Sequence, residues 1–320
     1  LATQPETEIK LADLVDNSLD AEADRIDIKI NKKDDYIEII DNGYGMSETI
    51  LAEAIKLGSD TDKGGSDLGR FGMGLVTASI SMARRIEVSS LQRHGEIHKV
   101  VLDLDEIANS GNWEVTSDTP SMYEQTILET NQQGTIVRLS KLDKVEKNIA
   151  GSTKSHFGEV FRKFIDAGRQ IYVDGEKIAP SDPLESNLDS TNILYDDEVE
   201  IDNKTFHLKI AHVGIDASKI SEGARNYNIP NQGFYIVRNN RQIAAGIDLD
   251  GILKKHNDYN RFRAEIECSS DLDDILKINF TKDEINVTQG MRDKVYSIVK
   301  PYMDLIRSTD KKQKQVDDAQ

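Results

Sequence analysis

The chain has 320 residues, of which 38% are hydrophobic and 30% charged, a composition typical of a globular protein with room for two domains. Its 40 basic and 57 acidic residues give a net charge of −17, which argues against a broad nucleic-acid-binding surface and leaves polyanion binding to a local patch. The single cysteine, Cys268, excludes an intrachain disulfide framework and a metal cluster made of cysteines.

The first predicted element is a helix over residues 10–23, with the sequence KLADLVDNSLDAEA. Its residues fall on two stripes at helical spacing, one able to pack in a core and one rich in oxygen acceptors. The packing stripe consists of Leu11, Leu14, Val15, Ser18 and Leu19, and the acceptor stripe of Asp13, Asp16, Asn17 and Asp20. Taken alone, the pattern also fits a surface helix with a solvated acidic face.

A β-hairpin is predicted next, because isoleucines alternate with polar residues over 25–30 and a second apolar run follows at 36–40. The hairpin leads directly into DNGYG (41–45). Read alone, this motif is a common turn.

A second helix is predicted after Ser47, which has the character of an N-cap, and it ends at Gly58. A polar, glycine-punctuated loop over 59–70 then leads through residues 71–74 into a helix of small residues that ends near Ala83. This pattern is typical of a flexible flap hinged on a helix N-terminus.

Strands at 85–91, 98–104 and 134–139 complete a predicted sheet with helices on one side, an α+β arrangement. The pattern loosens between 143 and 155, and we place a domain boundary there, so that the first domain covers 1–148.

The second predicted domain covers 149–307, and a tail of low apolar content, 308–320, is predicted to be mobile or a linker. The elements expected in it are a helix at 157–165, a hairpin at 170–178, strands at 205–213, 233–238, 241–244 and 263–268, and a helix at 291–306.

Four motifs follow one another along the first half: DLVDN (13–17), DNGYG (41–45), LGRFGMG (68–74) and GTIV (134–137). In order and spacing they resemble the nucleotide-binding boxes of the GHKL superfamily, which unites DNA gyrase, the ninety-kilodalton heat-shock chaperone, sensor histidine kinases and MutL. The resemblance implies a Bergerat-type α/β sandwich that binds ATP and Mg²⁺ under a mobile lid, and an ATPase activity.

Two residues of the first helix carry the chemistry that the resemblance implies. The amide oxygen of Asn17 suits Mg²⁺, which prefers oxygen ligands. Four residues earlier the related ATPases have a glutamate that deprotonates the attacking water, and here that position is Asp13. Because aspartate is one methylene shorter and a positioned base contributes roughly 10²–10⁴-fold in rate, we expect hydrolysis to be slow.

The base of the nucleotide is assigned to the second and fourth motifs. A carboxylate at Asp41 can accept a hydrogen bond from an exocyclic amine such as that of adenine, beside glycines that permit close approach of the backbone. The resemblance implies that Asp41 selects adenine, and the neighbouring positions it assigns to the nucleotide are Gly43, Gly45, Met46 and Thr135.

The phosphates are assigned to the third motif, where free backbone N–H groups precede a helix and gain from its dipole. The residues concerned are Gly69, Arg70, Phe71, Gly72, Met73 and Gly74. The glycine pattern is not interpreted as a dinucleotide fingerprint, because it follows a polar flap and not a strand, and no P-loop lysine follows it.

In the second half, Lys282 follows Phe280 and Thr281 in a predicted loop, and resembles the transducer lysine that contacts the γ-phosphate in gyrase-type and MutL-type enzymes. The segment 233–246 resembles the transducer region of Microrchidia-type ATPases, which implies a ribosomal-protein-like α+β transducer domain. Two arginines in it flank a turn and are either partner contacts or solvated. They are Arg238 and Arg241.

A zinc site at His94 and His98 is not favoured, since a strand turn separates the two histidines and no third ligand is evident.

By resemblance, ATP closes the lid and joins two protomers in a homodimer, and hydrolysis to ADP resets this clamp. DNA or a DNA-processing partner outside the chain, chaperone-like action on proteins, and nucleotide-gated binding with little turnover remain open alternatives. No apolar run reaches the ~20 residues of a membrane span and no secretory leader is present, so we expect a cytoplasmic protein with no membrane contact. Because the chain opens with Leu1, we expect it to be part of a longer protein.

Overall fold

The computed structural model describes residues 6–55, 74–143, 148–215, 227–277 and 285–317. These residues form two compact units. The first unit contains the described residues up to Gly158 together with Arg162–Pro180, and the second contains Glu159–Phe161 and the described residues from Ser181 onward. The first unit is therefore larger than the predicted domain 1–148.

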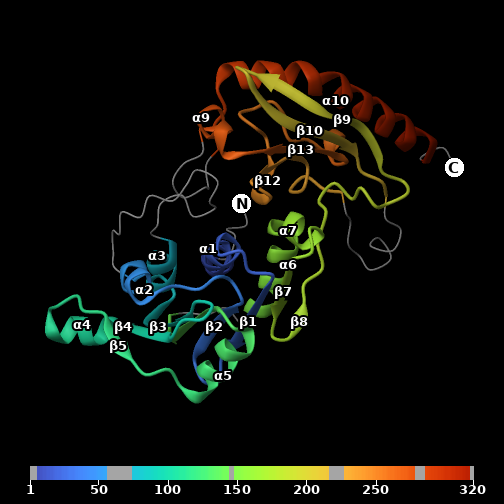
Figure 1. The fold of residues 1–320 in the computed structure, drawn as a ribbon. Coiled ribbons are helices and arrows are strands. Elements are labelled where there is room, and N and C mark those ends of the chain that lie inside the picture. Colours follow the sequence, from blue (N-terminus) through green and yellow to red (C-terminus); the bar gives the residue numbers. More distant parts are fainter. Residues whose placement is uncertain (1–5, 56–73, 144–147, 216–226, 278–284, 318–320) are drawn as a thin grey trace. The chain divides into compact units, whose positions relative to one another are not determined.

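An eight-stranded sheet forms the centre of the first unit, with the strand order β5-β4-β3-β6-β2-β1-β7-β8 (Figure 1). Its strands are β1 Arg25–Asn31, β2 Tyr36–Asp41, β3 Ala83–Leu91, β4 Ile97–Asp103, β5 Thr116–Asp118, β6 Gly134–Leu142, β7 Gln170–Val173 and β8 Glu176–Lys177. Strands β7 and β8 are the hairpin predicted for the second domain, but β7 pairs parallel to β1 and extends the first sheet.

Helices lie on both faces of this sheet. The described helices of this part of the chain are α1 Glu6–Asp20, α2 Glu48–Ala54, α3 Gly74–Ile80, α4 Leu104–Ser110, α5 Met122–Asn131, α6 Ile149–Val160 and α7 Arg162–Asp166. Figure 1 draws α1 and α5 on opposite sides of the sheet. The expectation of helices on one side is therefore wrong. Helix α5 packs on the second face because its buried Leu128 joins a cluster with Ile40, Leu91 and Ile136 from three strands.

Helix α1 buries the packing stripe that the sequence predicts, with Leu11 and Val15 fully buried. On the acceptor stripe, Asp13 and Asn17 are partly exposed. Asp16 is only 1% exposed and so lies with the buried residues, against the prediction.

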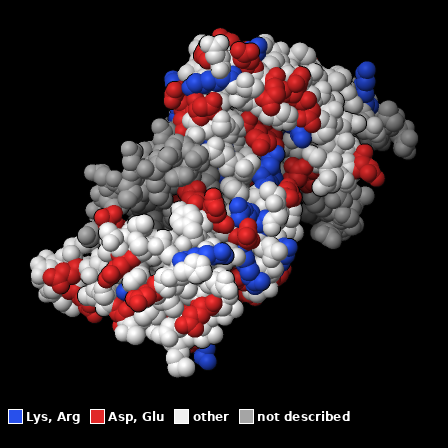
Figure 2. Space-filling model, viewed as in Figure 1, with Lys and Arg blue, Asp and Glu red and all other residues white. Residues whose placement is uncertain are grey.

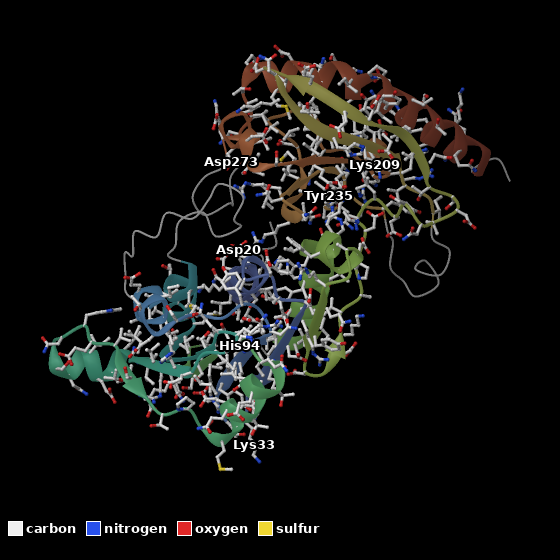
Figure 3. The ribbon with its side chains drawn as sticks, in the orientation of Figure 1. Asp20, Lys33, His94, Lys209, Tyr235 and Asp273 are labelled. Carbon is white, nitrogen blue, oxygen red and sulfur yellow. The ribbon has the colours of Figure 1, made fainter. Side chains whose placement is uncertain are left out.

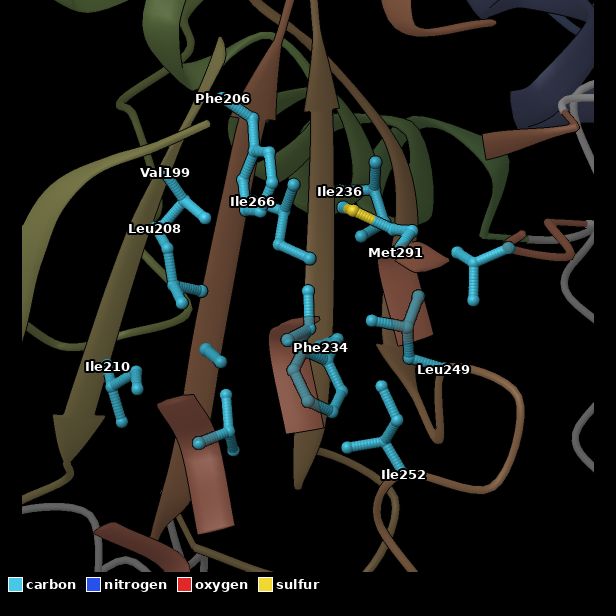
Figure 4. Packing of buried hydrophobic residues seen from close by; sticks show 14 of the residues in the cluster. Val199, Phe206, Leu208, Ile210, Phe234, Ile236, Leu249, Ile252, Ile266 and Met291 are labelled. Carbon is cyan, nitrogen blue, oxygen red and sulfur yellow. The ribbon is translucent and has the colours of Figure 1, made fainter. Parts of the chain in front are cut away.

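The second unit is built on a five-stranded sheet with the order β12-β11-β13-β10-β9. Its strands are β9 Asn192–Ile201, β10 Lys204–His212, β11 Gly233–Arg238, β12 Arg241–Ile247 and β13 Phe262–Cys268, and its helical segments are η1 Asn257–Tyr259, η2 Ser270–Leu272, α9 Asp273–Leu276 and α10 Gln289–Asp317. Figure 4 shows the apolar face of the sheet, where Leu208, Phe234 and Ile266 belong to the same buried cluster as Met291 of α10. The unit is thus α+β.

Helix α10 continues to Asp317, through most of the segment predicted as a mobile tail. After Ile306, polar contacts attach the helix to the rest of the unit. Asp310 is 9% exposed and accepts hydrogen bonds from His212 Nε2 and from Arg261, each at 2.8 Å. Arg307 adds a hydrogen bond to Asp258. The sequence prediction fails here because these partners lie about 50 or more residues away along the chain.

The two hairpin arginines of the second unit are buried and not solvated. Arg238 is 4% exposed and forms two hydrogen bonds with the carboxylate of Asp273, at 2.7 and 2.9 Å. Arg241 is 6% exposed. A surface role as partner contacts is therefore not supported for either residue.

No helix in the described part of the chain is long and apolar enough to cross a membrane. Figure 2 shows acidic side chains interspersed with basic ones over the visible face. This distribution agrees with the expectation that no broad basic surface is present there.

Candidate functional site

The site begins at the end of β2, where the buried carboxylate of Asp41 is held by three donors from different parts of the first unit. Its Oδ1 accepts from the backbone N–H of Gly43 at 2.9 Å and of Thr135 at 3.2 Å. Its Oδ2 accepts from the hydroxyl of Ser18 on α1 at 2.9 Å. Since a carboxylate has about four acceptor positions, one position on Oδ2 has no donor among the residues that the structure describes.

Polar residues continue from Asp41 in one row across the sheet. Thr135 on β6 is directly opposite Asp41, and Ser90 on β3 is directly opposite Thr135. Directly opposed residues point to the same face, here the face that carries α1. The row ends at His98 on β4, which pairs with Ser90.

Ser90 joins three parts of this site through a single hydroxyl. Its Oγ accepts from the backbone N–H of Met46 at 2.8 Å, donates to the carbonyl of Gly134 at 3.1 Å, and lies 3.0 Å from Oγ1 of Thr135. The DNGYG loop and strand β6 are thereby tied to β3.

Glycines let the backbone close around Asp41. A Cβ at Gly45, whose φ is +70°, would lie 2.1 Å from the carbonyl oxygen of Leu91. A Cβ at Gly43 would lie 2.7 Å from the carbonyl oxygen of Ala21 at the end of α1. Both distances are below any real contact, so only glycine fits at these two predicted site positions.

Burial dominates the electrostatics of Asp41. It raises the pKa of the carboxyl from 3.8 to about 6, although the hydrogen bonds from Gly43, Ser18 and Thr135 act in the opposite direction. The ionised form is therefore costly in the free protein, and a ligand donor that stabilises it gains from a preformed, desolvated acceptor.

Helix α5 supports the site from the opposite face of the sheet. A capping box at Ser121 and Glu124 begins the helix, and Glu124 also accepts from Ser89 and Lys99 on the neighbouring strands. At its other end, Gln133 donates to the carbonyl of Asn42 at 3.2 Å. Helix α5 and the residues that follow it thus support the backbone that carries Asp41 from the opposite face of the sheet.

Helix α1 places the two remaining described candidates, Asp13 and Asn17, one turn apart on its partly exposed side. The Nδ2 of Asn17 is buried and has no hydrogen-bond partner among the described residues. In the described part of the chain no group of three or more His, Cys, Asp or Glu side chains is arranged to hold a metal ion. The amide oxygen of Asn17 nevertheless has the chemistry that Mg²⁺ prefers in a ligand.

Several predicted site residues lie outside the described residues, namely Gly69, Arg70, Phe71, Gly72, Met73 and Lys282. Gly74 begins α3, which packs beside α1. Hydrogen bonds thus connect candidates of the second and fourth motifs, and Ser18 links them to α1, the helix that carries Asp13 and Asn17.

Two histidines weighed as metal ligands do not form such a site. His94 lies in the turn between β3 and β4 with φ +65°, and Figure 3 labels it there, whereas His98 lies on β4. This agrees with the predicted strand turn.

Two residues of the site, Ser18 and Ser90, are not predicted from the sequence. The sequence analysis assigns Ser18 to the packing stripe. A hydroxyl at a core position needs a hydrogen-bond partner, and this requirement is a signal by which Ser18 can be found. Ser90 gave no signal, because its partners lie 44 and 45 residues away.

Comparison with known proteins agrees with this geometry. Residues 6–135, from the start of α1 to the Thr135 of the site, match the family described as histidine kinase-, DNA gyrase B-, and HSP90-like ATPase. The match supports a GHKL-like ATPase domain over these residues. The mixed α/β architecture of the first unit, helices on a broad sheet, is the sandwich expected of a GHKL domain.

A curated protein that is similar to this chain is ATPase MORC2B of Mus musculus, which is 33% identical over 81 residues. The matched segment is 23% of this chain and 8% of the relative. The chain therefore spans a small part of that protein's length.

Proposed function

We propose that the first unit binds Mg·ATP with the adenine at Asp41, and that the chain hydrolyses it slowly. The observation that carries the proposal is the buried Asp41 carboxylate, which three donors hold with one acceptor position open, inside a domain that matches GHKL ATPases. A buried acceptor beside glycine-lined backbone suits a flat base with an exocyclic amine.

Asn17 would hold Mg²⁺ through its amide oxygen, and the ion would neutralise charge on the phosphate oxygens. Asp13, one turn earlier on α1, would orient and deprotonate the attacking water. Its shorter side chain places the carboxylate farther from the nucleotide than a glutamate would, and this is the reason for slow turnover.

The second unit would respond to the nucleotide through Lys282, whose compact charge distinguishes ATP from ADP. Lid closure over the bound nucleotide and an ATP-dependent homodimer complete the proposed cycle of a clamp. The resemblance of the motifs to MutL and Microrchidia-type ATPases favours DNA or a DNA-processing partner as its client. Light scattering with and without a non-hydrolysable ATP analogue tests the dimer, and a monomer in both conditions would refute it.

Calorimetric titration of the whole chain with Mg·ATP tests the binding site. Asn17→Ala should abolish Mg·ATP binding, whereas Asn109→Ala, an exposed position on α4, should leave it unchanged. Unchanged affinity in the Asn17 variant would remove this residue from the site.

Phosphate release tests the role of Asp13. Asp13→Asn should reduce the rate to background, and Asp13→Glu, which restores the longer base of the related ATPases, should raise kcat above the wild-type value by about tenfold or more. If wild type and Asp13→Asn both stay at background, the chain is a nucleotide-gated binding module and not an ATPase.

A further inference from the structure

This inference rests on the proposed function and concerns how the site distinguishes purines. The starting point is two adjacent serines on β3, Ser89 and Ser90, which are both fully buried. Successive residues of a strand point to opposite faces. Ser90 therefore points to the face of Asp41 and Thr135, whereas Ser89 points to the other face and donates to Glu124 at 2.9 Å.

The hydroxyl of Ser90 has one proton and two lone pairs, and three groups compete for them. The carbonyl of Gly134 can only accept, and the backbone N–H of Met46 can only donate. If the Ser90 proton goes to Gly134, its lone pairs accept from Met46 and from the hydroxyl of Thr135. We assign this arrangement because it uses the proton and both lone pairs of Ser90.

In this arrangement the proton of Thr135 is directed to Ser90, so that Oγ1 of Thr135 offers only lone pairs to a ligand. The open position on Oδ2 of Asp41 is also an acceptor, because the Ser18 hydroxyl already donates to that oxygen. Two acceptors side by side favour a donor such as the 6-amino group of adenine. They disfavour a 6-oxo group, which would bring a third acceptor into a buried site.

We propose that Ser90 is a positioning residue for purine selection: through its bonds to Thr135, Met46 and Gly134 it holds the site as an acceptor and so favours a 6-amino over a 6-oxo purine triphosphate. Ser90 acts through Thr135 and need not touch the nucleotide. Loss of its hydroxyl frees the Thr135 proton to rotate toward the ligand, and a 6-oxo group then finds a donor.

The test compares the Kd values of Mg·ATP and Mg·ITP, which differ at the 6-position of the purine, by calorimetry on the whole chain. Wild type should prefer ATP, and Ser90→Ala should reduce the ratio of the two affinities about tenfold. Ser89→Ala is the matched control, since it removes an equally buried hydroxyl one residue away and should leave the ratio unchanged. A purely structural role of Ser90 would weaken both nucleotides equally, and that result would overturn the inference.

Thr135→Val provides a second variant in case Ser90→Ala folds poorly. It should lower the same ratio, and the double variant should lose no more than either single one, because both act through one hydroxyl. If the double variant reduced the affinity ratio by the product of the two single reductions, this coupling would be refuted. A wild type that binds ATP and ITP equally would overturn the role of Ser90 but leave ATP binding intact, whereas a wild type that binds neither would overturn the proposed function as well.

Discussion

Replacement of Asp41 by asparagine should make the protein more stable and at the same time abolish nucleotide binding. Asparagine fits the same contacts, because its Oδ1 can accept from the N–H groups of Gly43 and Thr135 while its amide donates to Ser18. The substitution therefore removes a buried charge while a hydrogen bond is kept at each of the three contacts. Toward a ligand, however, the amide presents an N–H group where an exocyclic amine needs an acceptor.

The magnitude follows from the pKa of Asp41, which burial raises from 3.8 to about 6 in the folded protein. Between these values the folded state binds more protons than the unfolded state, so the contribution of Asp41 to stability falls as the pH rises through this window. The shift of roughly two units corresponds to about 3 kcal/mol once the group is fully ionised. Asp41→Asn should thus gain up to about 3 kcal/mol at pH 8, and the gain should shrink toward zero near pH 4.

Urea denaturation at several pH values measures the gain, and calorimetry measures the loss of Mg·ATP affinity, expected to exceed about 100-fold. Asp103→Asn is a control for which we expect the opposite change in the free energy of unfolding. Burial acts to raise the pKa of Asp103, but hydrogen bonds from Lys141, the Asp105 N–H and Arg85 lower it to about 2. Its charge stabilises the fold above pH 3.8, so its loss should destabilise at pH 8. An Asp41→Asn protein less stable than wild type at pH 8, or one with a pH-independent difference, would refute the reasoning.

Three further substitutions test other parts of the structure. Gly45→Ala should weaken Mg·ATP binding at least tenfold, because a Cβ would meet the Leu91 carbonyl at 2.1 Å, and calorimetry with normal affinity would contradict this close approach. Glu8→Met should stabilise the protein by ~1–3 kcal/mol in urea denaturation, since Glu8 is 2% exposed and neither carboxylate oxygen has a hydrogen-bond partner in the described part of the chain; a loss of stability would indicate a partner for this carboxylate. Asp310→Asn should cost ~3 kcal/mol and speed hydrogen exchange at the end of α10, because Arg261 and His212 lose a buried partner, and unchanged exchange would show that this helix end is held otherwise.

Local patterns in the sequence were sufficient for the parts of the fold whose determinants are neighbours in the chain. The hairpin of β1 and β2 follows from alternating isoleucines, and the turn that presents Asp41 follows from DNGYG. The capping box at Ser121 and Glu124 was also readable, yet the prediction omitted α5. Even that signal would not have placed α5 on the second face, because the three strand residues that receive Leu128 lie at distant positions in the chain.

Strand β7 and the end of α10 illustrate what periodicity leaves open. Alternation predicts the strand at β7, but its parallel partner β1 lies about 145 residues earlier, so the unit boundary falls near residue 180 and not at 148. The last turns of α10 carry few apolar residues and were predicted as a tail. An ion pair of Asp310 with Arg261 and a hydrogen bond with His212 attach these turns to the rest of the second unit.

For the site, local sequence patterns were sufficient for the identity and order of the four motifs that we propose to bind the nucleotide, including Asn17, Asp41 and Asp13, because the residues of each motif are neighbours in the chain. The structure was needed to show that Asp41 is a buried acceptor with a raised pKa and that Ser18 and Ser90 belong to its surroundings. The physical reason is that burial and hydrogen bonding are properties of three-dimensional neighbours, and these neighbours come from α1, β2, β3 and β6.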